Sequence, residues 1–161
     1  MSSRDSEIRP PSLLALPSFL AGNVARIGYR LLLDAFAEHE LRLAHAAVLA
    51  ALFDFGPLAQ YELADRLDIQ RSHLVGHVDL LEQRGLVERE RDPKDRRRQN
   101  VALTKSGRAL WRRLGPVAKR SQAPLLDVLS ETEREALLAL LGRVLRAHDE
   151  ARLRAVADVP G

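Results

Sequence analysis

The chain contains 161 residues, of which 46% are hydrophobic and 29% charged, as in an ordinary soluble globular protein. Only 4% are aromatic, so aliphatic side chains must fill the core, which favours helix packing over a sheet. The absence of cysteine excludes disulfides, thiol catalysis and thiolate zinc sites, and it points to the cytoplasm. No segment is apolar and long enough for a membrane span, so we expect no membrane partner. Residues 11–25 faintly resemble a signal peptide, but the segment before them is mixed in charge and prolines bracket the apolar part, so we expect none.

The positive charge is concentrated in one short segment. The formal net charge is only +3, although the sequence pI is about 9.8. Within residues 89–98 basic side chains outnumber acidic ones, whereas the rest of the chain is close to neutral. Such a focused patch indicates contact with a polyanion at one place on the surface.

The first third of the chain is predicted to be helical. Residues 1–12 are polar and contain two consecutive prolines, which predicts a flexible arm. Apolar residues recur at helical spacing over 19–39 and 42–55, and Gly56–Pro57 ends the second of these helices.

Two short helices joined by a tight turn follow. We expect them over 59–67 and 71–84, with the turn at 68–70 and with Gly85 in a left-handed cap position. Ser72 and Gly76 lie on the outer face of the second helix. The residues that share its opposite, core-facing side are Leu74, Val78 and Leu81.

Two alternating segments over 87–91 and 99–103 predict a hairpin, with Val87, Val101 and Leu103 facing inward. Thr104 caps the next helix, which Gly115–Pro116 and Ala123–Pro124 are expected to kink or end. Ser130 and Glu133 form a capping box for a last helix that runs to about residue 152. The order of elements predicts a mainly α fold with a small β-hairpin wing, typical of a winged helix-turn-helix protein.

The hairpin tip carries the strongest chemical signal. Asp95 and Arg97 are two residues apart, so in an extended segment they share a side and the carboxylate can orient the guanidinium toward a narrow minor groove. Arg96 and Arg98 point the other way and can reach phosphates. A solvated basic loop without a partner is the alternative interpretation.

The segment DPKDRRRQNVALTKSG resembles the wing-to-helix signature of the MarR family of transcriptional regulators, and ELADRLDIQRSHLVGHVDLLEQRGLV resembles the family's helix-turn-helix. The resemblance is specific over about residues 45–110. It implies a dimer of winged helix-turn-helix protomers in which Arg71, Ser72 and His73 enter the major groove. Gln70 departs from the family pattern, where a serine commonly caps this helix.

The resemblance implies one domain over 13–152, with dimerisation helices at 13–44 and 105–152 and the winged helix-turn-helix at 45–104, followed by a tail at 153–161. The residues that we expect to contact DNA are Gln70, Arg71, Ser72, His73, Val75, Gly76, His77, Arg89, Lys94, Asp95, Arg96, Arg97 and Arg98.

Members of this family often bind small aromatic anions between the two lobes. Candidate lining residues are Tyr29, Phe36, His45 and Trp111, with Arg112 or Arg113 as the counter-charge. Packing in the core or at the dimer interface is the alternative role for the three aromatic side chains, and it is the interpretation that we favour from sequence.

His73 and His77 have the spacing of metal ligands on a helix, but no third ligand is evident, so we expect no metal site and no cofactor. No set of nucleophile, base and orienting group is present, which argues against an enzyme. The sequence therefore predicts a homodimeric repressor that binds double-stranded, pseudo-palindromic DNA and is released by a small effector. The alternative is a winged-helix module that binds an acidic protein.

Arg97→Ala tests the role of the hairpin tip. The substitution should weaken DNA binding strongly and leave the free energy of unfolding almost unchanged, because an exposed arginine contributes little to stability. Asp95→Ala should cause a smaller loss, since it frees the guanidinium without removing it. Titration of labelled duplex together with thermal melting checks both effects, and wild-type affinity in Arg97→Ala would refute the role.

Overall fold

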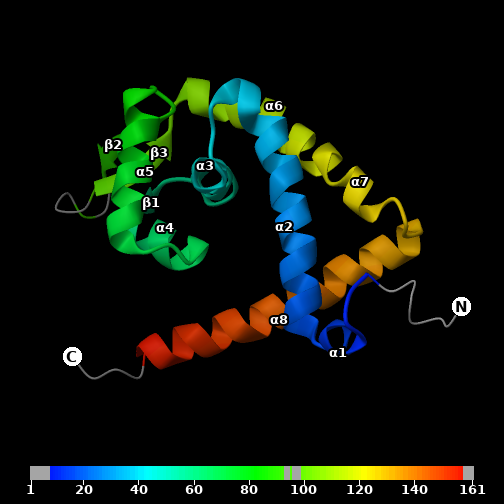
Figure 1. Ribbon diagram of the computed structural model, residues 1–161. Coiled ribbons are helices and arrows are strands. Elements are labelled where there is room, and N and C mark those ends of the chain that lie inside the picture. The colour runs from blue at the N-terminus through cyan, green and yellow to red at the C-terminus, as the bar shows by residue number, and fades with distance from the viewer. Residues whose placement is uncertain (1–7, 93–94, 96–98, 158–161) are drawn as a thin grey trace, which may run out of the picture. The chain divides into compact units, whose positions relative to one another are not determined.

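A computed structural model describes residues 8–92, 95 and 99–157 (Figure 1). The chain divides into two compact units, residues 1–122 and 123–161. The boundary between them falls inside residues 13–152, which the sequence predicts to form one domain. The first unit contains both helices of the helix-turn-helix and the strands that follow them. The second contains two helices.

Three helical segments open the described chain. The short helix α1 (Pro11–Leu14) begins inside the segment expected to be an arm. Helix α2 (Pro17–Phe36) starts at a proline, whose fixed φ suits the first helical position, and continues into a 3₁₀ turn at Ala37–His39. Helix α3 (Leu43–Phe55) agrees within one residue with the prediction of 42–55.

Helix α3 is the central element of the first unit and packs against α2, α4, α5 and α6. It is apolar on nearly every side, as expected of a helix surrounded by others. The backbone N–H of Arg42 donates to Nδ1 of His45 at its start, and Gly56 ends it with a φ of +80°. A positive φ is what glycine adopts without steric cost.

The helix-turn-helix consists of α4 (Gln60–Leu67) and α5 (Arg71–Gln83). The prediction that α4 starts at residue 59 is wrong by one residue, because Leu58–Ala59 form a short strand, β1. A carboxylate oxygen of Glu62 accepts the backbone N–H of Ala59 at 3.0 Å and so satisfies a donor at the start of α4.

The end of α5 shows the cap predicted for Gly85, which has a φ of +66°. Its N–H donates to the carbonyl of Glu82, and the N–H of Leu86 donates to the carbonyl of Leu81, both at 2.9 Å. This pair of bonds is a Schellman motif, which satisfies carbonyls that a helix end leaves unpaired. It turns the chain directly into the next strand.

Strands β2 (Val87–Arg91) and β3 (Gln99–Leu103) occur where the alternation predicts them. The sheet has three strands in the order β1-β3-β2, all antiparallel, so β1 adds a strand to the expected hairpin. Val87 and Val101 are buried as predicted, whereas Leu103 is half-buried.

Helix α6 (Lys105–Ser121) is capped by Thr104, whose Oγ1 accepts the N–H of Gly107 at 3.0 Å. The helix continues through Pro116, so the expected interruption there does not end it; it ends just before Ala123–Pro124. Gly107 is required by packing, because a Cβ there would lie 1.9 Å from the carbonyl oxygen of Leu86.

The second unit consists of α7 (Ala123–Leu126) and α8 (Glu131–Ala157). The capping box is present as predicted: Ser130 N–H donates to Glu133 at 2.8 Å, and Oγ of Ser130 accepts the Glu133 N–H at 3.4 Å. Arg134 Nε donates to the carbonyl oxygens of Leu126 and Leu129, which closes the end of α7.

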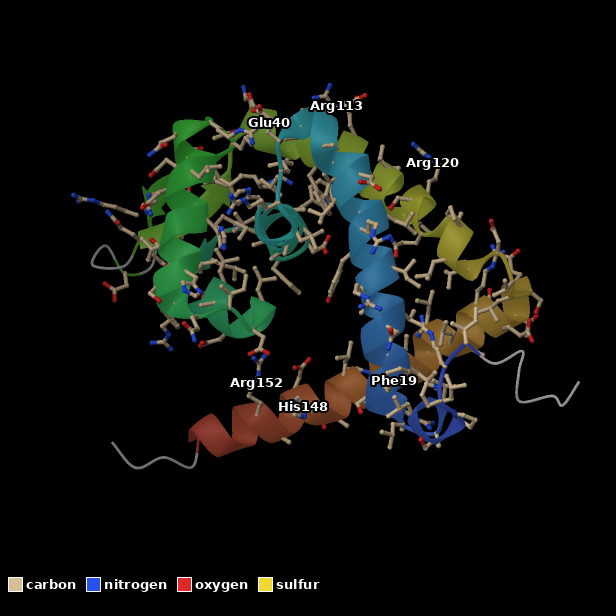
Figure 2. The ribbon with its side chains drawn as sticks, in the orientation of Figure 1. Phe19, Glu40, Arg113, Arg120, His148 and Arg152 are labelled. Carbon is tan, nitrogen blue, oxygen red and sulfur yellow. The ribbon has the colours of Figure 1, made fainter. Side chains whose placement is uncertain are left out.

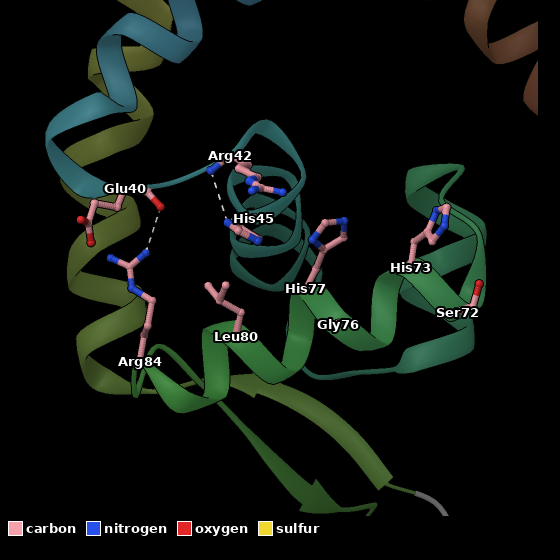
Figure 3. Close-up of a pocket in the computed structure, with 9 residues that line it drawn as sticks. All are labelled: Glu40, Arg42, His45, Ser72, His73, Gly76, His77, Leu80 and Arg84. Carbon is pink, nitrogen blue, oxygen red and sulfur yellow. Dashed lines mark hydrogen bonds between the residues drawn. The ribbon is translucent and has the colours of Figure 1, made fainter.

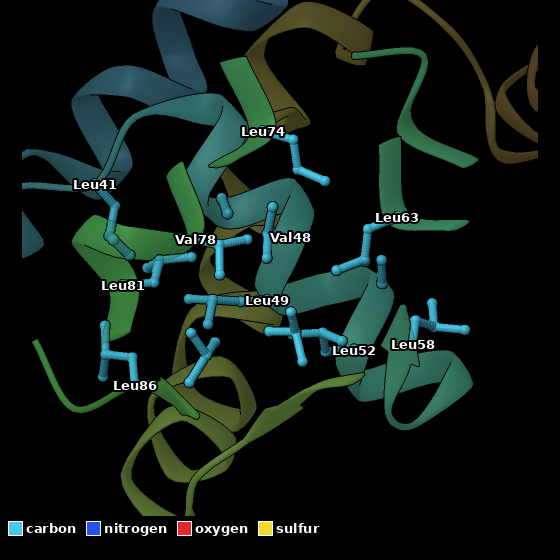
Figure 4. Packing of buried hydrophobic residues seen from close by; sticks show 14 of the residues in the cluster. Leu41, Val48, Leu49, Leu52, Leu58, Leu63, Leu74, Val78, Leu81 and Leu86 are labelled. Atoms are coloured by element: carbon cyan, nitrogen blue, oxygen red, sulfur yellow. The ribbon is translucent and has the colours of Figure 1, made fainter. Parts of the chain in front are cut away.

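The hydrophobic core of the first unit lies between α3, α5 and the sheet (Figure 4). Leu74, Val78 and Leu81 of α5 all have 0% exposure, which confirms the predicted core-facing side. They pack in one cluster with residues of α3 such as Val48 and Leu49. The mainly α fold with a β wing is therefore confirmed.

No helix in the described part of the chain has the length and apolar character of a membrane span.

Leu74→Ala and His73→Ala together test the orientation of α5. Leu74→Ala should lower the free energy of unfolding by roughly 2–5 kcal/mol, because it leaves a cavity in the core. His73→Ala, one residue away on the exposed face, should change stability by less than about 0.5 kcal/mol. Urea denaturation of both variants measures the difference, and equal destabilisation would contradict the assigned faces.

Candidate nucleic-acid interface

The exposed face of α5 carries the residues expected to enter the major groove. Arg71, Ser72, His73, Val75 and Gly76 are all exposed. Gln70 stands at the cap without a side-chain hydrogen bond, as its departure from the family pattern predicts. Helix N-termini carry unpaired N–H groups and partial positive charge, so this start of α5 is suited to a phosphate.

Arg71 is held by two residues of α4. Its guanidinium lies 3.6 Å from a carboxylate oxygen of Asp65 and 5.9 Å from the centre of the Tyr61 ring. Both the arginine and the aspartate side chains are more than half exposed, so the ion pair orients Arg71 without adding much stability. The contacts of Arg71 with Asp65 and Tyr61 could not be predicted from local spacing, because they cross the turn to the preceding helix.

Gly76 lies in the middle of α5, where glycine costs about 1 kcal/mol relative to alanine. Its backbone is helical, and a Cβ built there meets no atom within 4 Å. Neither backbone conformation nor packing within the described residues requires glycine at this position.

Histidines line a pocket between α5 and the start of α3 (Figure 3). Its volume is about 820 Å³, and His45 and His77 meet edge to face with ring centres 5.1 Å apart. Arg42 and Arg84 also line it, and the Arg84 guanidinium donates to the carbonyl oxygens of His39 and Glu40.

Of the three histidines that line this pocket, His45 and His77 have a lowered pKa, which favours their neutral form. Burial, followed by the charges of His77, Arg42 and Arg84, lowers the pKa of His45 below its ordinary value. Burial and the neighbouring His73 and Arg42 lower the pKa of His77. Because His45 is 3% exposed and its Nδ1 accepts a backbone N–H, it supports the start of α3. His77, expected to contact DNA, is half-buried against it.

Arg89 does not present its guanidinium to solvent as expected for a DNA contact. It donates to Asp79 Oδ1 at 2.5 Å, to Glu82 and, through Nε, to Gln60 Oε1 at 3.2 Å. Burial opposes its charge, but the bonds to Asp79 and Glu82 raise the pKa of Arg89 above its ordinary value. The side chain thus joins β2 to both helices of the helix-turn-helix.

Asp92, which follows β2, accepts hydrogen bonds from Asp95 and Asn100. Its Oδ1 accepts the backbone N–H of Asp95 at 3.1 Å, and its Oδ2 accepts Nδ2 of Asn100 at 3.0 Å. Asp95 is exposed. The other predicted tip residues, Lys94, Arg96, Arg97 and Arg98, lie outside the described residues.

The structure separates the residues proposed for a ligand site. Tyr29, Phe36 and Trp111 line one cavity of about 430 Å³ between α2, α3 and α6, together with aliphatic side chains. His45 instead lines the histidine pocket. Arg112 and Arg113, the proposed counter-charges, are exposed and do not line the aromatic cavity. Figure 2 labels Arg113 on α6.

No group of three or more histidine, aspartate or glutamate side chains within the described ranges is placed to hold a metal ion. His73 and His77 both line the histidine pocket, His73 exposed and His77 half-buried.

Arg89→Ala tests whether this side chain keeps α5 compatible with DNA. The substitution leaves the carboxylates of Asp79 and Glu82 without a counter-charge next to a surface that would meet phosphates. Duplex affinity should fall at least about tenfold, or 1.4 kcal/mol, while stability should change by about 1 kcal/mol or less, since the cluster is partly exposed.

The double variant Arg89→Ala/Asp79→Asn is the matched control, because it removes one of the two repelling charges. It should recover part of the lost duplex affinity in a fluorescence anisotropy titration. No recovery would mean that Arg89 acts through some property other than charge compensation.

Comparison with known proteins identifies the family to which this chain belongs. The sequence profile of the MarR family matches residues 41–98. The regulator PecS of Dickeya dadantii is 31% identical over 140 residues, which cover 83% of this chain and 84% of that protein. Two further curated relatives are matched over only 65% and 56% of their own length.

Two solved structures share the fold. The transcriptional repressor CouR bound to a 23-mer DNA duplex is 32% identical, with a TM-score of 0.78 over 87% of this chain and 99% of that one. PcaV of Streptomyces coelicolor, in complex with its natural ligand, is 31% identical, with a TM-score of 0.71 over 88% and 99% of the two chains. With its exposed α5, its β wing and these relatives, the chain belongs to the MarR family of transcriptional regulators.

Proposed function

We propose that the protein is a cytoplasmic, homodimeric repressor that binds a pseudo-palindromic DNA site through α5 and the wing and is released by a small molecule. The observation that carries the proposal is the division of α5 into two faces. Leu74 is fully buried, whereas Ser72 and His73 beside it are exposed. A helix fixed in this way can enter a major groove without rearranging.

Electrostatics support the same partner. The start of α5 carries the partial positive charge of a helix N-terminus. Arg71 is oriented beside it by Asp65, and the basic hairpin segment follows within the same unit. The relative CouR has been solved on a DNA duplex. Together these features suit phosphate contacts from the helix and wing, with base contacts from Ser72 and His73.

Exposed apolar side chains support a dimer. Leu20, Val24 and Ile27 on α2 are each more than 40% exposed, as are Leu141 and Val144 on α8. Large apolar surfaces on small chains commonly mark subunit interfaces. A two-fold dimer would present two copies of α5 to half-sites one helical turn apart.

The aromatic cavity is the site that we propose for the effector. It is lined by Tyr29, Phe36 and Trp111 with aliphatic side chains, and no charged residue is among its lining. Because an uncompensated carboxylate is costly to bury in such surroundings, the cavity suits an uncharged aromatic molecule better than the aromatic anion that the family resemblance implies. The relative PcaV has been solved with its natural ligand.

Footprinting of the intergenic DNA upstream of the coding sequence tests the function. We expect a protected pseudo-palindrome with half-sites roughly 10 bp apart. Log K should fall with log salt concentration at a slope of about −0.9 for each phosphate neutralised. Salt-independent binding, or tight binding to one asymmetric half-site, would refute a dimeric DNA-binding regulator and favour the protein-binding module.

The same footprint distinguishes the two classes of effector. An aromatic amide should release the protein from DNA at lower concentration than the matching aromatic carboxylate does. Trp111→Ala should weaken this release without changing DNA affinity in the absence of ligand. Stronger release by the carboxylate would indicate a site with a counter-charge instead of the aromatic cavity.

A further inference from the structure

Gly76 is among the residues that line the histidine pocket, but neither packing nor backbone conformation within the described residues requires a glycine there. It occupies an exposed position in the middle of α5 and has an ordinary helical backbone. A Cβ at this position would meet open space, with no atom within 4 Å. The cause of the glycine must therefore be sought in what approaches α5 from outside.

Gly85 and Gly107 are positions at which the fold itself requires a glycine. Gly85 has a positive φ of +66°, which L side chains rarely adopt. Gly107 has no room for a Cβ, because the carbonyl oxygen of Leu86 would lie 1.9 Å away. Gly76 has neither feature, yet it retains the helix penalty of glycine.

The surroundings of Gly76 define the chemistry of its partner. It follows Val75, which is 42% exposed, and it shares the outer face of the helix with Ser72 and His73 (Figure 3). Ser72 and His73 can form hydrogen bonds, whereas Val75 and the Cα of Gly76 offer only apolar contact. This small apolar spot lies between polar groups on the face that we propose enters the major groove.

We propose that Gly76 determines operator specificity by making room for the 5-methyl group of a thymine. The inference rests on the proposed function and assigns one base contact within it. Thymine is the base that presents an apolar group in the major groove. Without a Cβ at Gly76, the helix backbone can approach that methyl group closely, while Ser72 and His73 read neighbouring base edges.

Gly76→Ala separates this role from a structural one, because stability and DNA affinity should change in opposite directions. The melting temperature should rise by about 2–4 °C, since alanine is the better helix former. Affinity for the operator should fall about tenfold or more, and affinity for random duplex should change little. Gly115→Ala is the matched control: its Cβ meets the Trp111 ring only at ordinary contact distances of 3.8 and 3.9 Å, and it should leave operator affinity unchanged.

Uracil substitution in the operator identifies the methyl group. Each thymine of the footprinted site is replaced in turn by uracil, which lacks only the 5-methyl group. At one symmetry-related pair of positions the replacement should weaken wild-type binding and restore the affinity of Gly76→Ala to within about threefold of the wild-type value. The added methyl of alanine then occupies the space that the thymine methyl has left.

The outcomes separate this inference from the proposed function. If the wild-type chain binds no duplex specifically, both fail. If the wild type binds its operator and Gly76→Ala binds it equally well, only the role of Gly76 is overturned. A loss of affinity that no uracil position restores also overturns the assignment to a thymine methyl group.

Discussion

Helix α5 is held against α3 by Leu74, Val78 and Leu81, none of which is exposed to solvent. This contact fixes the rotation of α5 about its own axis, and every other feature of the interface follows from that rotation. A turn of the helix by one residue would bury His73 and expose Leu74. The core therefore determines which side chains can meet a duplex, although none of its members touches the surface.

Charge compensation is the second requirement of the interface. The outer side of α5 carries Asp79 and Glu82, which would repel a polyanion, and the fold supplies Arg89 from β2 to neutralise them. The same guanidinium reaches Gln60 of α4, so one side chain connects β2 to both helices of the helix-turn-helix. The role of Arg89 is therefore structural, although a positive charge at this position would also suit a contact with phosphate.

Local patterns were sufficient to predict much of this molecule. The faces of α5, the cap at Gly85 and the limits of β2 and β3 depend on spacing within a few residues, and these predictions are confirmed. Strand β1 could not be predicted, because two residues are too few to show alternation. Pro116 does not end α6, which was one of the two outcomes expected there, since the loss of one helical hydrogen bond does not end a helix that packs against its neighbours.

Contacts between distant segments account for the remaining errors. Arg89 lies seven and ten residues from its carboxylate partners and 29 from Gln60, so no local pattern reveals the cluster. The candidate ligand residues divide into two sites for a similar reason. His45 and the aromatic side chains come from neighbouring helices, but α3 directs His45 toward α5 and leaves the aromatic cavity on its other side.

The junction around Leu86 has a consequence for local opening. Leu86 N–H is bonded to the last turn of α5, its carbonyl accepts the N–H of Thr104, and Oγ1 of Thr104 donates to the carbonyl of Gly85. These bonds share their residues, so breaking one exposes the partners of the next. We therefore expect the base of the hairpin, the end of α5 and the first turn of α6 to open together in amide hydrogen exchange. A unit that opens as a whole also closes as a whole, so the helix and the base of the wing can meet a duplex as a single preassembled body.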